Sequence, residues 1–179
     1  MMSTRFVAAF GVACFTIGAL VQAGVAQGKK PVFSPDIFKK EPMAAGTELL
    51  DGALQLAENG SWERIAVGRA WYLGGDKARG QRIFDEVTSS KKVERSDWIR
   101  VARVYVEANE WERAQQAFDK ALPAGTRDDT GLVEYGGYAL LHHDPAKAEE
   151  LFNRAFLKNK DEFWHWVNAG GAYLGVAPQ

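Results

Sequence analysis

Cysteine is almost absent from this chain of 179 residues, because Cys14 is the only one. A disulfide framework needs pairs of cysteines, so the sequence excludes the disulfide-stapled class of small secreted domains. Cys14 also lies inside an apolar run near the N-terminus, and no cysteine follows it as a nucleophile or metal ligand. Stability must therefore come from packing, for which a hydrophobic content of 46% is ordinary.

An excess of charge of either sign is also lacking. The chain carries 22 Lys and Arg against 23 Asp and Glu, a net charge of −1. Binding to nucleic acid or to an anionic membrane surface calls for a basic excess. We therefore expect neither partner, and any charged binding site must be a local one.

Patterns typical of catalysis are scarce. The best metal-like cluster is the run His142, His143 and Asp144, and His165 is the only other histidine. Adjacent residues on a helix point about 100° apart, whereas zinc needs three or four converging ligands. We find no phosphate-binding loop and no serine in a recognisable nucleophile setting. The sequence predicts no enzymatic activity, no metal site and no cofactor.

The first 26 residues differ from the rest. One positive charge, at Arg5, precedes an uncharged and mostly apolar run of 16 residues at positions 6–21. A membrane-spanning helix needs about 20 apolar residues, so the pattern favours a cleaved signal peptide over a retained anchor. The expected cleavage follows Ala26, with Ala23 as the alternative. We therefore expect an exported protein of the bacterial cell envelope, periplasmic or secreted, with no stable membrane span after cleavage.

Residues 27–42 form the only proline-rich stretch, with Pro31, Pro35 and Pro42 among them. Three prolines at this spacing forbid a long helix, so the stretch is expected to be a linker or arm. Its apolar side chains Phe33, Ile37 and Phe38 either dock on the body or stay exposed, and we expect a loosely held arm.

A repeat of 34 residues runs through the remainder of the chain, which has a helical pattern and no convincing strand. Phe84, Phe118 and Phe152 recur at this interval. A small residue precedes each phenylalanine by four positions, at Gly80, Ala114 and Ala148. Small residues recur at the same interval in a second helical pattern, at Gly68, Ala102, Gly136 and Gly170. Spacings of three and four place such residues on one helix face, where a neighbouring helix can approach.

These segments resemble the tetratricopeptide (TPR) repeat, whose unit reads W-x2-L-G-x2-Y and then A-x3-F-x2-A. Residues 98–105 and 114–121 match with Ala102 in place of the glycine, and residues 166–173 match with Ala169 in place of the leucine. Arg64 and Ala139 depart from the aromatic positions, and the usual proline near the end of each unit is missing.

The resemblance implies an all-α fold, a right-handed α-solenoid of helical hairpins with about eight helices. Its TPR-like domain spans residues 43–179, with a helix at 43–59, repeats at about 61–94, 95–128 and 129–162, and a closing helix at 163–175. Asp76 and Asp144 are expected helix N-caps. Gly170 is expected to allow close approach to the preceding helix pair, and Gly175 to end the last helix.

The resemblance also implies a binding surface, because first helices of TPR units line a concave face that binds peptides or partner helices. The positions that usually face this groove are Trp62, Arg69, Tyr72, Ser96, Arg100, Arg103, Thr130, Glu134, Trp164 and Asn168. Three of the arginines would form a positive patch beside aromatic rings, suited to an acidic or carboxylate-ending peptide. The alternative is that they pair with Glu107, Glu134 or other groove carboxylates.

The sequence therefore predicts an exported protein-interaction module, or scaffold, that binds a protein or peptide partner through its concave face. The alternative function is a structural or self-associating component of a cell-envelope assembly. The pattern names neither the partner nor the oligomeric state.

Overall fold

The computed structural model describes residues 30–179, which form eight α-helices and one short 3-10 helix. The α-helices are α1 (Pro42–Ala57), α2 (Ser61–Leu73), α3 (Lys77–Thr88), α4 (Arg95–Glu107), α5 (Trp111–Ala121), α6 (Asp129–Leu141), α7 (Pro145–Phe156) and α8 (Phe163–Tyr173). No strand occurs within these residues. The expected all-α class and the number of helices are confirmed. The expected signal peptide and residues 27–29 lie outside the described residues.

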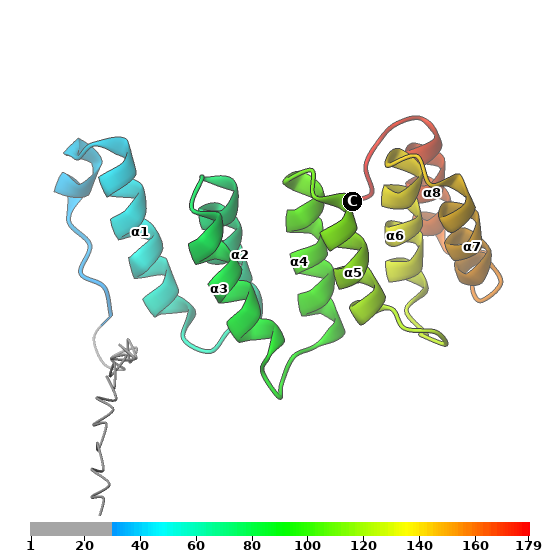
Figure 1. Cartoon of the computed structure of the whole chain (residues 1–179), viewed down its shortest axis with the longest axis horizontal. Coiled ribbons are helices and arrows are strands. Elements are labelled where there is room, and N and C mark those ends of the chain that lie inside the picture. The colour runs from blue at the N-terminus through cyan, green and yellow to red at the C-terminus, as the bar shows by residue number, and fades with distance from the viewer. Residues whose placement is uncertain (1–29) are drawn as a thin grey trace, which may run out of the picture.

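Three helical hairpins form the middle of the molecule, and Figure 1 shows them standing side by side in chain order. The hairpins are α2 with α3, α4 with α5, and α6 with α7, and each pair packs closely. Helix α1 packs on α2 at one end, and α8 packs on α6 at the other. Within residues 30–179 neither end helix has a hairpin mate of its own. No helix in the described part of the chain is both long and apolar enough to cross a membrane.

Local capping interactions explain where the helices begin and end. Asp76 and Asp144 accept hydrogen bonds from the backbone N–H three residues on, at 2.9 Å and 3.0 Å. These contacts satisfy donors that the first turn leaves free, so both predicted N-caps are confirmed. Asn109 and Gly175 adopt positive φ angles of 58° and 81° just past the ends of α4 and α8, the backbone geometry that closes a helix.

Close approach of small residues holds each hairpin together. A methyl group on Gly80 of α3 would lie 2.6 Å from the backbone oxygen of Gly68 on α2, so no larger residue fits. Phe84 then packs beside Gly68, and Phe118 occupies the equivalent buried position in the second hairpin. The repeated small and aromatic residues therefore build the continuous core.

Gly170 does not fulfil the role expected of it. Nothing lies within 4 Å of the place where its Cβ would be. The equivalent Gly68 and Gly136 make room for Phe84 and Phe152, which belong to the second helix of the same hairpin. Helix α8 has no second helix in the described chain, so the space beside Gly170 is open. The expectation that Gly170 packs against the preceding helix pair is wrong.

The arm before α1 is not loosely held along its whole length. A short 3-10 helix, η1 (Pro35–Lys39), packs on α1 and buries Ile37. Pro31 lies beside Gly52 of α1, at van der Waals distance from the place of a Cβ. Phe33 and Phe38 contact each other and stay exposed. The expectation of a loosely held arm is therefore wrong for this part, because Ile37 anchors the arm to α1.

Candidate functional site

Two hollows flank Arg100 on the face made by the first helices α2, α4 and α6. The first has a volume of about 180 Å³ and is lined by Ser61, Trp62, Glu94, Ser96, Asp97 and Arg100. The second has a volume of about 210 Å³ and is lined by Ser96, Ile99, Arg100, Arg103, Asp128, Thr130, Gly131 and Glu134. Six of the ten predicted groove residues thus gather around these two hollows. We call this surface the Arg100 site.

Arg100 forms the common wall of both hollows. Its guanidinium carbon lies 5.4 Å from the centre of the exposed Trp62 ring, within the range of a cation–π contact. Its Nη1 donates a hydrogen bond to the Ser96 carbonyl oxygen at 3.2 Å. Arg100 forms no ion pair with any carboxylate in residues 30–179. Because a guanidinium carries five N–H donors, most of this group's donors remain for a ligand.

Arg103 is engaged by a carboxylate. Its Nε and Nη2 donate to the two oxygens of Glu134 at 2.5 Å and 2.7 Å. Glu134 is only 5% exposed, and this hydrogen bonding raises the pKa of Arg103 above its ordinary value. The bidentate pair joins α4 to α6 and satisfies a buried charge. For Arg103 the alternative of an internal ion pair is therefore confirmed.

Arg69 is paired in the same way, on the neighbouring junction. Its Nε donates to both oxygens of Glu107, at 2.9 Å and 3.1 Å, and its Nη2 also contacts this carboxylate. The pair links α2 to α4 and is about half exposed. Two of the three arginines predicted to form a free positive patch are thus neutralised, which leaves Arg100.

Tyr72 is not a groove residue. Its ring is 1% exposed and packs against Phe84 and Tyr105 at centroid distances of 5.6 Å and 5.7 Å. Its hydroxyl donates to Glu110 at 2.6 Å. The twelfth position of this helix therefore belongs to the core, because the second hairpin covers it.

Sequence reasoning missed the polar cluster around Glu110, which joins the first two hairpins. Glu110 accepts hydrogen bonds from Tyr72, from Lys77 at 2.5 Å and from Arg113 at 3.1 Å. Arg113 also donates to Gln81. Burial opposes ionisation of Glu110, but the three donors outweigh it and lower its pKa. No pattern marks this cluster, because its members are distributed over residues 72–113.

The predicted extension of the groove at α8 is covered by the C-terminal segment. The Asn168 side chain accepts a hydrogen bond from the backbone N–H of Gln179 at 3.2 Å. Pro178 lies so close to Gly137 of α6 that a Cβ there would be 2.5 Å away. Asn168 is consequently buried, whereas Trp164 remains half exposed beside Phe163. Neither residue lines the hollows of the Arg100 site.

The histidine run near α7 makes packing contacts. His142 stacks on Trp111 at a centroid distance of 4.5 Å and an interplanar angle of 5°. Burial, with a smaller contribution from His143, lowers the pKa of His142 and favours the neutral ring. Within residues 30–179 no group of three or more His, Cys, Asp and Glu side chains could hold a metal ion.

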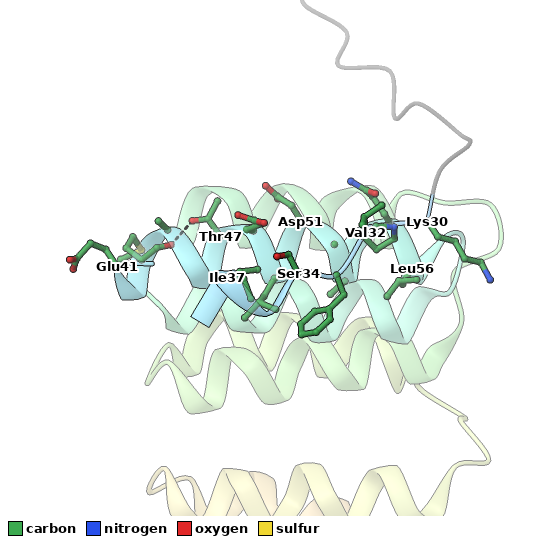
Figure 2. Close-up of a pocket in the computed structure, with 17 residues that line it drawn as sticks. Lys30, Val32, Ser34, Ile37, Glu41, Thr47, Asp51 and Leu56 are labelled. Carbon is green, nitrogen blue, oxygen red and sulfur yellow. Dashed lines mark hydrogen bonds between the residues drawn. The ribbon is translucent and has the colours of Figure 1, made fainter. Parts of the chain in front are cut away.

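A larger cleft lies outside the predicted groove, between the arm and α1. Its volume is about 1090 Å³. Figure 2 shows the arm residues Val32, Ser34 and Ile37 running along α1, with Leu56 at one end of the cleft. The exposed side chains of Phe33 and Leu49 also line it. Sequence reasoning missed this cleft because it requires the arm to dock.

Comparison of the chain with protein-family models, with curated proteins and with solved structures gives no match. The fold class rests on the helices themselves, and the likeness to TPR repeats stays a prediction from the sequence.

Proposed function

We propose that this chain is an exported TPR-type interaction module that binds an acidic segment of a partner protein at the Arg100 site. The observation that carries the proposal is Arg100 itself, a guanidinium without a carboxylate partner in the described chain, next to an exposed tryptophan. Arginine and tryptophan are the residues that most often dominate protein interfaces. The proposed role is binding, and no residue is assigned a catalytic one.

The surroundings of Arg100 support an anionic ligand, because most carboxylates of the two hollows already have partners. Glu134 is held by Arg103. Asp128 accepts from the backbone of Gly131 at 2.9 Å and lies 3.3 Å from Arg95. Asp97 accepts from the Glu94 backbone N–H at 2.9 Å. A partner carboxylate could therefore form a bidentate contact with Arg100 while an adjacent apolar side chain packs on Trp62.

The decisive experiment reverses the charge at the site. We expect Arg100→Glu to weaken capture of envelope proteins at least tenfold, which corresponds to about 1.4 kcal/mol. Arg82→Glu is the matched control, because it makes the same charge change at an exposed position of α3, outside both hollows. Captured partners should then bind as isolated acidic peptides, and Glu→Gln and Asp→Asn versions of these peptides should bind more weakly.

Circular dichroism must show unchanged helicity in both variants. Equal capture by Arg100→Glu and by the unmodified chain would refute the proposed site. Trp62→Ala provides an independent measurement, since loss of the ring should weaken the same peptides without changing the charge of the surface.

The proposed export rests on the N-terminal pattern, and it has a separate test. We expect the chain recovered from the cell envelope to begin at Gln27, or at Gly24 if the alternative site is used. N-terminal sequencing or intact mass measures this directly. A chain that retains Met1 in the cytoplasm would contradict export without affecting the Arg100 site.

A further inference from the structure

The two end helices are complementary halves of one hairpin. Helix α1 holds the register of a second helix, because its Gly46 precedes Gly80 of α3 by one 34-residue repeat. Helix α8 holds the register of a first helix, because its Gly170 follows Gly136 of α6 by one repeat. In the described part of the chain, each end helix therefore corresponds to the half of a hairpin that the other end helix is missing.

No packing contact within one copy of the chain explains why positions Gly46 and Gly170 hold glycine. Nothing lies within 4 Å of the Cβ position of either residue. In the closed first hairpin the equivalent pair meets directly, with the Gly80 position 2.6 Å from the Gly68 carbonyl. A glycine inside a helix destabilises the helix relative to alanine, which is a cost without a packing gain here. Both end helices carry this cost at the place where a hairpin mate would approach.

Apolar side chains at equivalent repeat positions are buried in the middle hairpins and exposed in the end helices. Ile83 of α3 and its equivalents Ala117 of α5 and Leu151 of α7 are 1–4% exposed. The equivalent residue of α1, Leu49, is 42% exposed. Ile65 of α2 and its equivalents Ile99 of α4 and Val133 of α6 are 0–8% exposed. The equivalent residue of α8, Val167, is 41% exposed. In the middle of the molecule these positions belong to buried clusters to which several neighbouring helices contribute, whereas within residues 30–179 each end helix has fewer helices beside it.

We propose that copies of this chain join head to tail, with α8 of one copy packing on α1 of the next as α2 packs on α3. The interface would bring Gly170 against Gly46 and cover Val167 and Leu49. Such a contact uses two different surfaces, so it generates open chains or closed rings rather than a two-fold dimer. It is independent of the Arg100 site.

The cleft beside α1 adjoins the surface on which the incoming helix would pack, because Leu49 and Ala53 line it. Leu49, Gly52, Ala53 and Leu56 are among the α1 residues that line this cleft. The arm forms its other wall (Figure 2). Helix α8 presents a stripe of exposed apolar side chains along one side: Phe163, Trp166, Val167 and, just past its end, Leu174. The arm would then flank the incoming helix, and side chains of this stripe would enter the cleft.

The test uses two blocking variants of the full chain. Gly46→Leu fills the open position on α1, and Gly170→Leu fills the one on α8. Both positions are open in a single copy, so each variant should fold with unchanged helicity. Gln116→Leu is the matched control, because it adds the same side chain at an exposed position of α5.

Sedimentation velocity over a hundredfold range of concentration gives the result. The unmodified chain and Gln116→Leu should grow beyond the mass of two copies. Each blocking variant alone should remain a single copy. An equal mixture of the two should form a species of two copies and no larger, since one free α8 then meets one free α1.

Several outcomes would overturn the proposal. These are an unmodified chain that stays a single copy throughout, a blocking variant that still assembles alone, and a mixture that forms no pair. Assembly of Gly46→Leu alone would indicate an α8 to α8 contact instead. Should a leucine disturb either helix, Leu49→Lys and Val167→Lys repeat the same scheme at exposed positions, with the same expected masses.

Discussion

The middle of the molecule and its two ends contain the same repeated residues in different surroundings. In the middle hairpins a small residue of one helix meets the backbone of its mate, as Gly80 meets Gly68. At the ends, Gly46 holds the repeat position of Gly80 and Gly170 holds that of Gly68, and both face open space. The comparison shows that a repeated residue is buried by its neighbouring helix rather than by its own identity.

The two regions should differ most in the stability lost when an apolar side chain is shortened to alanine. Phe118→Ala removes a fully buried ring that stacks on Tyr135 at 4.6 Å, and we expect a loss of about 3–5 kcal/mol in the free energy of unfolding. Leu49→Ala at the exposed end should lose about 1 kcal/mol or less. Urea denaturation at low protein concentration measures both. Similar losses would mean that the end helix is as tightly packed as the middle.

Alanine at Gly80 and at Gly170 should have opposite effects on stability. Gly80→Ala places a methyl group 2.6 Å from the Gly68 carbonyl and 2.7 Å from the Tyr72 Cβ, so overpacking should destabilise the chain by about 1–3 kcal/mol. Gly170→Ala meets nothing within 4 Å and should stabilise it by up to about 1 kcal/mol. Thermal unfolding at equally low protein concentrations, at which the chain is a single copy, gives the sign of each change. Equal signs would refute the assignment of an open position at Gly170.

Two ion pairs of the middle region differ in burial and should differ in strength. Arg103→Ala leaves the buried Glu134 without its cation, and we expect the free energy of unfolding to fall by about 1–2 kcal/mol. Solvent limits the loss, because the Arg103 side chain is 44% exposed and its charge is partly screened. Arg69→Ala, at the more exposed pair with Glu107, should lose at most about 1 kcal/mol. Chemical denaturation of both variants at low and high salt distinguishes the two pairs.

The smallest expected effect is a pH dependence of folding stability that arises from the Glu110 cluster between the first two hairpins. The pKa of Glu110 is lowered from 4.5 in the folded chain, so the folded state holds its proton less tightly than the unfolded state. This contribution is fully present above the unfolded pKa and disappears as the pH falls through the folded value. We expect Glu110→Gln to reduce the loss of stability between neutral pH and pH values below about 4.5. An unchanged pH profile in this variant would contradict the role of the cluster.

Much of the fold could be predicted from local pattern alone. The interval of 34 residues predicted repeated helices, the resemblance to TPR repeats implied about eight of them, and the capping residues Asp76 and Asp144 marked two of their starts. These features act over one or two helical turns, so a single sequence displays them. The candidate site was predicted less well, because Tyr72 lies in the core and the C-terminal segment covers Asn168.

The type and spacing of the helices follow from residues that are near one another in the chain. The tertiary structure decided which predicted groups are free, since Glu107 and Glu134 reach Arg69 and Arg103 from helices more than thirty residues away. It also decided that Ile37 anchors the arm and that Gly170 faces open space. The physical reason is that helix formation depends on near neighbours in the chain, whereas ion pairing and burial depend on which helix comes alongside.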